Sequence, residues 1–125
     1  MQYSTLALVA TFALVSSAAL ADDPMANTYA NTVTTKSQKT GQTGTLLFNA
    51  DGSYSASTTG ADGKPFAYQG KWVVKDGGAT ICLSPTLPNP PPTSCSPLHA
   101  HGVGDSWSVT NDQGETFDVS MTAGR

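Results

Sequence analysis

FAYQGKWVV, at residues 66 to 74, places its large side chains at every second position. Such alternation is typical of a strand with one buried face and argues against the longer period of a helix. The inward face would carry Phe66, Tyr68, Gly70, Trp72 and Val74. A glycine on the packed face of a long strand often marks a sharp bend. We therefore predict one long strand here, with a bend at Gly70.

The same alternation recurs from residue 28 onward. It is clearest at residues 117–122 (FDVSMT) and 107–110 (WSVT). Shorter runs predict further strands at residues 29–35, 44–48, 53–58, 80–83 and 94–98. Turn sequences rich in Asp, Asn and Gly lie at residues 49–52, 62–65, 75–78 and 111–114. Because no helical segment separates the strands, we expect sequence neighbours to pair antiparallel as a simple meander.

Eight short antiparallel strands with one apolar face can close into a barrel or form a β-sandwich. Closure removes the free strand edges that otherwise recruit other chains. We therefore predict an all-β fold, a small eight-stranded antiparallel up-and-down barrel, with the sandwich as the alternative. The side chains expected inside, beyond those of residues 66–74, are Leu46, Phe48, Tyr54, Ile81, Leu83, Trp107, Val109, Phe117, Val119 and Met121.

The first 21 residues differ in composition from the rest of the chain. An apolar run at residues 6–15 precedes Ala19-Leu20-Ala21, and this pattern is typical of a cleaved secretory signal. Residues 6–21 are fewer than the roughly 20 needed to span a bilayer. We predict a signal peptide at 1–21, a flexible N-terminal tail at 22–27 and a barrel domain at 28–125. The protein would be periplasmic or secreted, with no membrane span after cleavage.

Both cysteines of the chain, Cys82 and Cys95, fall in one short segment. In an oxidising compartment such a pair is expected to form a disulfide. Closing a loop of this size stabilises the fold by about 3 kcal/mol in the simple loop-entropy model. Five prolines between the cysteines fix the backbone and withhold amide donors. The segment is therefore interpreted as a stiff, covalently closed connection between two strands.

Charge and motif content exclude several classes of function. The net charge is −3, and the six Lys and Arg residues are scattered singly, which disfavours nucleic-acid binding. The Asp residues of the turns lack the close spacing of a calcium loop. Glu115 and Asp118 would lie on opposite faces of a strand, and both histidines lie in one loop without a catalytic signature. We predict a protein that is not an enzyme and has no cofactor.

Two groups of residues are candidates for binding. In an extended segment His99 and His101 would share a face and could hold one Cu(II) or Zn(II) ion, although only Asp105 is near as a further ligand. An ordinary exposed loop is the favoured interpretation. Separately, four inward rings could line a pocket for an apolar ligand, and filling of the barrel is their favoured role. These rings are Tyr54, Tyr68, Trp72 and Trp107.

A succession of short motifs also resembles a known group of proteins. These are NTV (31–33), FNADGSY (48–54), GKW (70–72), CL (82–83), a second cysteine at 95, GDSW (104–107) and Gly124. Their order resembles small exported bacterial lipocalin-like β-barrel proteins, many of unknown function. The resemblance implies fold, compartment and a single disulfide, and brings no catalytic residues with it.

A more distant likeness is to periplasmic inhibitors of secreted metalloproteases, whose flexible N-terminal segment enters the protease cleft. Residues 22–27 could be such a segment. The cysteines here flank a proline loop on neighbouring strands, so this likeness stays at the level of the fold. Three functional hypotheses follow: an inhibitor-like module that binds an unknown protein partner, a lipocalin-like carrier of a small apolar ligand, and an envelope structural protein.

Overall fold

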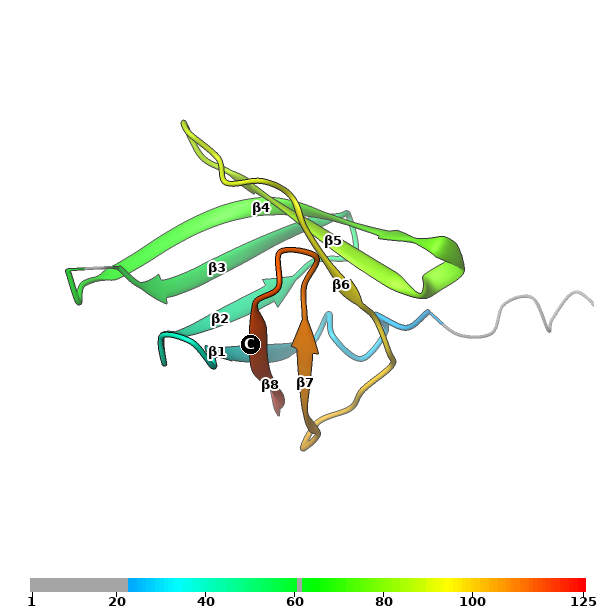
Figure 1. Cartoon of the computed structure of the whole chain (residues 1–125). Coiled ribbons are helices and arrows are strands. Elements are labelled where there is room, and N and C mark those ends of the chain that lie inside the picture. The colour runs from blue at the N-terminus through cyan, green and yellow to red at the C-terminus, as the bar shows by residue number, and fades with distance from the viewer. Residues whose placement is uncertain (1–22, 61) are drawn as a thin grey trace, which may run out of the picture.

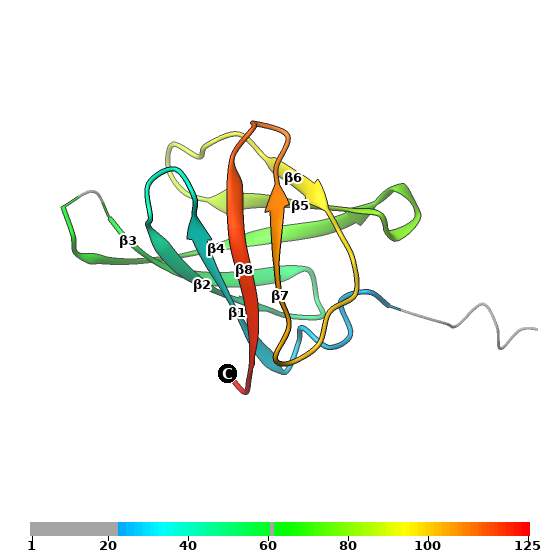
Figure 2. The same cartoon turned by 60° about the horizontal axis from the view of Figure 1, so that its bottom comes forward.

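The computed structural model describes residues 23–60 and 62–125, and within them it is an eight-stranded antiparallel barrel that is nearly closed (Figures 1 and 2). The predicted signal peptide at 1–21 lies outside these residues. No helix in the described part of the chain has the length and apolarity needed to cross a membrane. The strands are β1 (Asn31–Ser37), β2 (Thr43–Phe48), β3 (Ser53–Thr59), β4 (Pro65–Lys75), β5 (Thr80–Thr86), β6 (Ser94–Pro97), β7 (Ser106–Thr110) and β8 (Thr116–Ala123).

The strand order is β6-β5-β4-β3-β2-β1-β8-β7. The first six strands form the predicted meander, and β7 and β8 form a hairpin. β1 pairs with β8, from Asn31 opposite Ala123 to Ser37 opposite Phe117, so the two ends of the sheet are β6 and β7. All eight strands form one sheet, and hydrogen bonds between β6 and the turn after β7 bring its two ends together, which confirms the predicted barrel in a nearly closed form.

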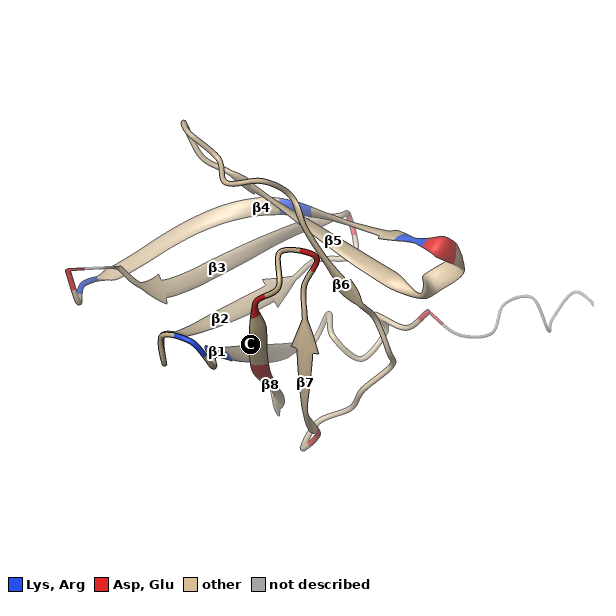
Figure 3. Ribbon diagram, viewed as in Figure 1, with Lys and Arg blue, Asp and Glu red and all other residues tan. Residues whose placement is uncertain are grey.

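The turns between strands use the Asp and Gly residues that the sequence points to. In the turn before β3, Asp51 Oδ1 accepts the Ser53 N–H at 2.9 Å and Gly52 has φ of 94°. A side chain with a Cβ rarely adopts this φ, so the glycine is required there. Many of the acidic residues lie in such turns at the ends of the barrel (Figure 3). The carboxylate of Asp51 therefore shapes the chain locally.

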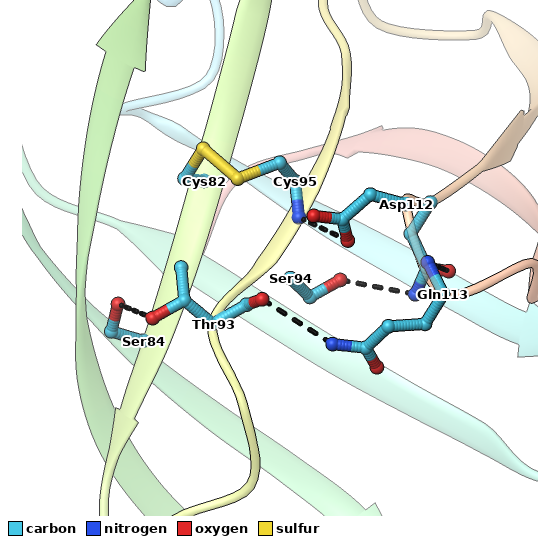
Figure 4. Close-up of a disulfide and its surroundings, with 8 residues drawn as sticks. Cys82, Ser84, Thr93, Ser94, Cys95, Asp112 and Gln113 are labelled. Carbon is cyan, nitrogen blue, oxygen red and sulfur yellow. Dashed lines mark hydrogen bonds between the residues drawn. A yellow bond between two sulfur atoms is a disulfide. The ribbon is translucent and has the colours of Figure 1, made fainter.

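One pair of sequence neighbours, β6 and β7, does not pair as the meander predicts, and we call this gap the seam. β6 ends at Pro97, which has no amide hydrogen to extend a ladder, and the chain crosses the end of the barrel before β7 begins. The turn after β7 bridges the seam instead (Figure 4). The Asp112 N–H donates to the Cys95 carbonyl at 2.9 Å, the Cys95 N–H donates to Asp112 Oδ1 at 3.1 Å, and Asn111 Nδ2 donates to Ser94 Oγ at 3.0 Å.

The barrel interior holds the predicted inward side chains with one exception. Phe66 was expected inside, but 46% of its surface is exposed. β5 ends opposite Gln69, so residues 65–68 of β4 pair only with β3 and project beyond the neighbouring wall. The ring of Phe66 therefore packs only on the edge of the interior, with its centroid 5.8 Å from that of Tyr68.

Gly70 lies inside the barrel directly opposite Tyr54 of β3. A Cβ built on Gly70 would lie 2.5 Å from the Cζ and hydroxyl oxygen of Tyr54. The sequence pattern predicts a bend at this glycine, and the structure shows that Gly70 has a packing role. Its missing side chain makes room for the phenol ring to lie against β4.

Residues 23–29 form a turn that fills one end of the barrel, and we call them the N-terminal plug. Met25 is only 3% exposed and belongs to the core. Asp23 holds the turn, because its Oδ1 accepts the Met25 N–H at 2.9 Å and its Oδ2 accepts the Tyr29 hydroxyl at 3.0 Å. Within the segment predicted as a tail, at 22–27, burial of the apolar Met25 side chain anchors this turn to the core.

Candidate binding cavity inside the barrel

A cavity of about 350 Å³ lies inside the barrel, and every one of the eight strands of the described chain contributes to its wall. Its surface is mainly apolar, with Val33, Leu46, Ile81, Leu83 and Val119 among the lining side chains. Small-molecule sites in proteins typically enclose about 300–1,000 Å³. The cavity therefore has room for one small ligand.

The two ends of the cavity differ. At one end the N-terminal plug contributes the buried side chains of Met25 and Thr28. At the other end lie the turn after β7 and the segment 87–93 between β5 and β6, which we call the proline loop. Pro91, Gln113 and Glu115 line the cavity there and are themselves exposed. Exposed residues therefore line the cavity at the proline-loop end, and Pro97 and His99, at and after the end of β6, are exposed lining residues as well.

The structure brings three of the four predicted ring residues to the cavity wall, namely Tyr54, Tyr68 and Trp107. Trp72 is not among the lining residues. Its Nε1–H donates to the carbonyls of Asn49 and Ser53, both at 3.0 Å, so the indole fastens the turn between β2 and β3. Trp72 thus has a structural role at the plug end.

The interior is not filled by its aromatic rings, although filling was the favoured expectation. Several lining positions carry small polar side chains that leave space, including Thr35 on β1 and Ser94 and Ser96 on β6. Sequence reasoning missed the two serines. The alternation in SCSP (94–97) could have found them, because it places both on the face opposite to that of Cys95.

Two phenol hydroxyls lie in this apolar interior. Tyr54 is 2% exposed, and Tyr68 is half-buried on the neighbouring strand. Among the described residues, neither hydroxyl has a hydrogen-bond partner. Burial raises the pKa of both phenols above the ordinary value of 10.0, and the neighbouring Tyr68 raises that of Tyr54 further. Both groups are therefore neutral at physiological pH and can donate one hydrogen bond each.

The cavity wall carries little charge. Glu115 is the one Lys, Arg, Asp or Glu side chain of the described chain that lines it, and it lies at the exposed proline-loop end. Among the described residues no Lys or Arg lines the cavity, so an anion placed deep in it would lose its hydration without an ammonium or guanidinium partner, which is strongly unfavourable. The wall therefore suits uncharged molecules.

Among the described residues, His99 and His101 belong to no larger ligand set. Residues 99–101 lie in no strand, so the period that would put both imidazoles on one face does not apply to them. The ring of His101 stacks on Trp107, with centroids 3.5 Å apart and planes within 5°, and His101 Nδ1 lies 3.7 Å from Asp105 Oδ2. Within the described residues no group of three or more His, Cys, Asp or Glu side chains is placed to hold a metal ion.

The predicted disulfide between Cys82 and Cys95 is confirmed (Figure 4). The two residues lie directly opposite each other on β5 and β6, with Cα atoms 4.0 Å apart. Their strand neighbours Ile81, Leu83 and Ser94 line the cavity, so the disulfide lies on the outer face of the wall. It holds β6, the strand beside the seam, to the rest of the sheet.

Comparison with protein-family models, with curated proteins and with solved structures finds no match to this chain.

Proposed function

We propose that this protein is a non-enzymatic carrier that binds one small apolar molecule inside its barrel, as lipocalins do, in the periplasm or outside the cell. The internal cavity with its apolar wall is the observation that carries the proposal. The disulfide supports the oxidising compartment, because such bonds persist mainly in exported proteins.

The size of the cavity limits the affinity. A ligand that buries about 300 Å² of apolar surface would gain roughly 7 kcal/mol at about 25 cal/mol per Å². Loss of its translational and rotational freedom offsets part of this gain. We therefore expect dissociation constants in the micromolar range or weaker for simple apolar probes.

Two tryptophans at different places allow a direct test. Trp107 lines the cavity and Trp72 does not, so a heavy-atom quencher that acts on contact distinguishes them. In Trp72→Phe, which keeps Trp107, bromobenzene should quench the emission in a saturable manner. In the matched variant Trp107→Phe it should quench only weakly. Equal saturable quenching of both variants, or of neither, would contradict a ligand site in the barrel. Native mass spectrometry of freshly isolated protein should in addition show a bound small molecule.

A protein-binding role is the second candidate, and the proline loop is the observation that favours it. Residues 88–92 are all exposed, and four of the five are proline. Extended proline segments dock into aromatic grooves of partner proteins with little loss of chain entropy. Burial of Met25 does not favour the use of residues 22–27 as a segment that enters a protease cleft. Replacing residues 88–92 with Gly and Ser should then abolish capture of a partner from a periplasmic or exoprotein extract.

A further inference from the structure

The hydroxyls of Tyr54 and Tyr68 indicate what chemistry the ligand carries. Both side chains line the cavity, and their rings meet edge-on with centroids 6.4 Å apart. Gly70 lets the Tyr54 ring lie against β4, with its hydroxyl oxygen 2.5 Å from the position that a Cβ on Gly70 would take. Buried hydroxyls in folded proteins are normally hydrogen-bonded, and among the described residues these two have no partner.

The surroundings of the hydroxyls define the complementary group. Both side chains line the cavity, and both phenols carry their proton, so each has one O–H to donate. The neighbouring wall is apolar, and Glu115 is exposed at the mouth. A neutral oxygen acceptor would satisfy a phenol without the desolvation cost that an anion bears. A pure hydrocarbon could accept a hydrogen bond from neither hydroxyl, and the Tyr54 hydroxyl, on a side chain only 2% exposed, would stay unpaired.

We propose that the ligand is an uncharged molecule with an apolar body and one acceptor oxygen, such as a ketone, ester or ether, which accepts a hydrogen bond from Tyr54 or Tyr68. This inference rests on the proposed carrier function and names the ligand class of the same cavity.

Three probes with the same naphthalene body test the ligand class. They are 2-acetylnaphthalene, which carries the acceptor oxygen, 2-ethylnaphthalene, which lacks it, and 2-naphthoate, which is an anion. Their dissociation constants are measured by calorimetry or by nuclear magnetic resonance titration. The naphthoate should bind the native protein more weakly than the ketone, because no Lys or Arg of the described residues lines the cavity.

The decisive measurement compares the ketone with the hydrocarbon in Tyr→Phe variants, which remove the hydroxyl and keep the ring. Tyr54→Phe or Tyr68→Phe should weaken binding of 2-acetylnaphthalene about threefold to tenfold, the effect of one neutral hydrogen bond. Binding of 2-ethylnaphthalene should stay the same or strengthen in that variant. Tyr29→Phe is the matched control, because the Tyr29 hydroxyl bonds to Asp23 and Tyr29 does not line the cavity. It should leave the ratio of the two affinities unchanged, because it removes no hydroxyl from the cavity wall.

The outcomes separate this inference from the proposed function. If both variants affect ketone and hydrocarbon equally, the inference is wrong and the cavity remains a ligand site. If 2-naphthoate binds more tightly than the ketone, the neutral class is wrong. If none of the three probes binds the native protein, the carrier function fails and the inference fails with it. A thermal melt of each variant checks that it is folded. If Tyr54→Phe does not fold, Tyr68→Phe alone provides the test.

Discussion

Replacing Gly70 with alanine should destabilise the barrel, because the added methyl group has no space. Its carbon would lie 2.5 Å from the Cζ of Tyr54, whereas carbon atoms in contact are normally about 3.5–4.0 Å apart. The Tyr54 ring has little freedom to move away. It is 2% exposed, and its centroid lies 5.9 Å from that of Phe48 and 6.4 Å from that of Tyr68.

The size of the effect follows from two opposing contributions. Overpacking a core by one methyl group costs about 1–3 kcal/mol, and the tight flanking of the ring argues for the upper part of this range. Alanine regains roughly 0.5–1 kcal/mol, since glycine loses more backbone freedom on folding. The free energy of unfolding should therefore fall by about 2 kcal/mol, which is a large part of the roughly 5–15 kcal/mol typical of a domain.

Urea unfolding of Gly70→Ala, followed by tryptophan emission, measures this change. Gly102→Ala is the matched control, because the nearest atom to its built Cβ is Asn27 Nδ2 at 4.0 Å, and it should shift the free energy by less than about 0.5 kcal/mol. In a Tyr54→Leu background the penalty of Gly70→Ala should largely disappear. A penalty that persists undiminished in that background would refute the ring as its cause.

Three further predictions follow from the same structure. Reduction of the disulfide between Cys82 and Cys95 should lower the free energy of unfolding by about 3 kcal/mol in urea titrations. The double Cys→Ser variant should be as unstable as the reduced protein, and reductant should not change its stability. Asp112→Ala should speed hydrogen exchange at the Cys95 amide, because it removes the acceptor oxygen. Asp112→Asn keeps an acceptor oxygen and should not speed this exchange. Equal exchange in both variants would exclude this hydrogen bond as the closure of the seam. Burial and the hydrogen bond to Asp23 raise the pKa of Tyr29 to about 12, so the stability from this group is present below pH 10 and is lost between pH 10 and about 12. In Tyr29→Phe the urea midpoint of unfolding should fall less steeply as the pH rises from 10 to about 12. An unchanged pH dependence would contradict the assignment of this loss of stability to Tyr29.

The alternation of residues 66–74 correctly indicates which face of β4 turns inward, but it does not fix the height of each residue along the barrel. Tyr68 and Trp72 share that face, yet one lines the cavity and the other fastens a turn. Phe66 shares it too and lies beyond the end of β5. Height depends on the register between strands, and a local period does not contain that information.

The N-terminal plug and the cavity depend on contacts between distant parts of the chain. Met25 has no periodic neighbours, so its burial could not be inferred from its own segment. The space inside arises because the small side chains of Thr35 and Ser94, from strands far apart in sequence, face the same interior. The disulfide, by contrast, needed only the count and spacing of the cysteines and the predicted export.

The seam leaves the barrel wall without strand pairing along one line, between β6 and β7. β6 and β7 share no backbone ladder, and the turn containing Asp112 spans the gap with a few hydrogen bonds at the proline-loop end. Separation of β6 from β7 along this line would break none of the seven strand pairings. For the carrier function that we propose, the separation that β6 and β7 allow would set the largest ligand, in place of the volume of the resting interior.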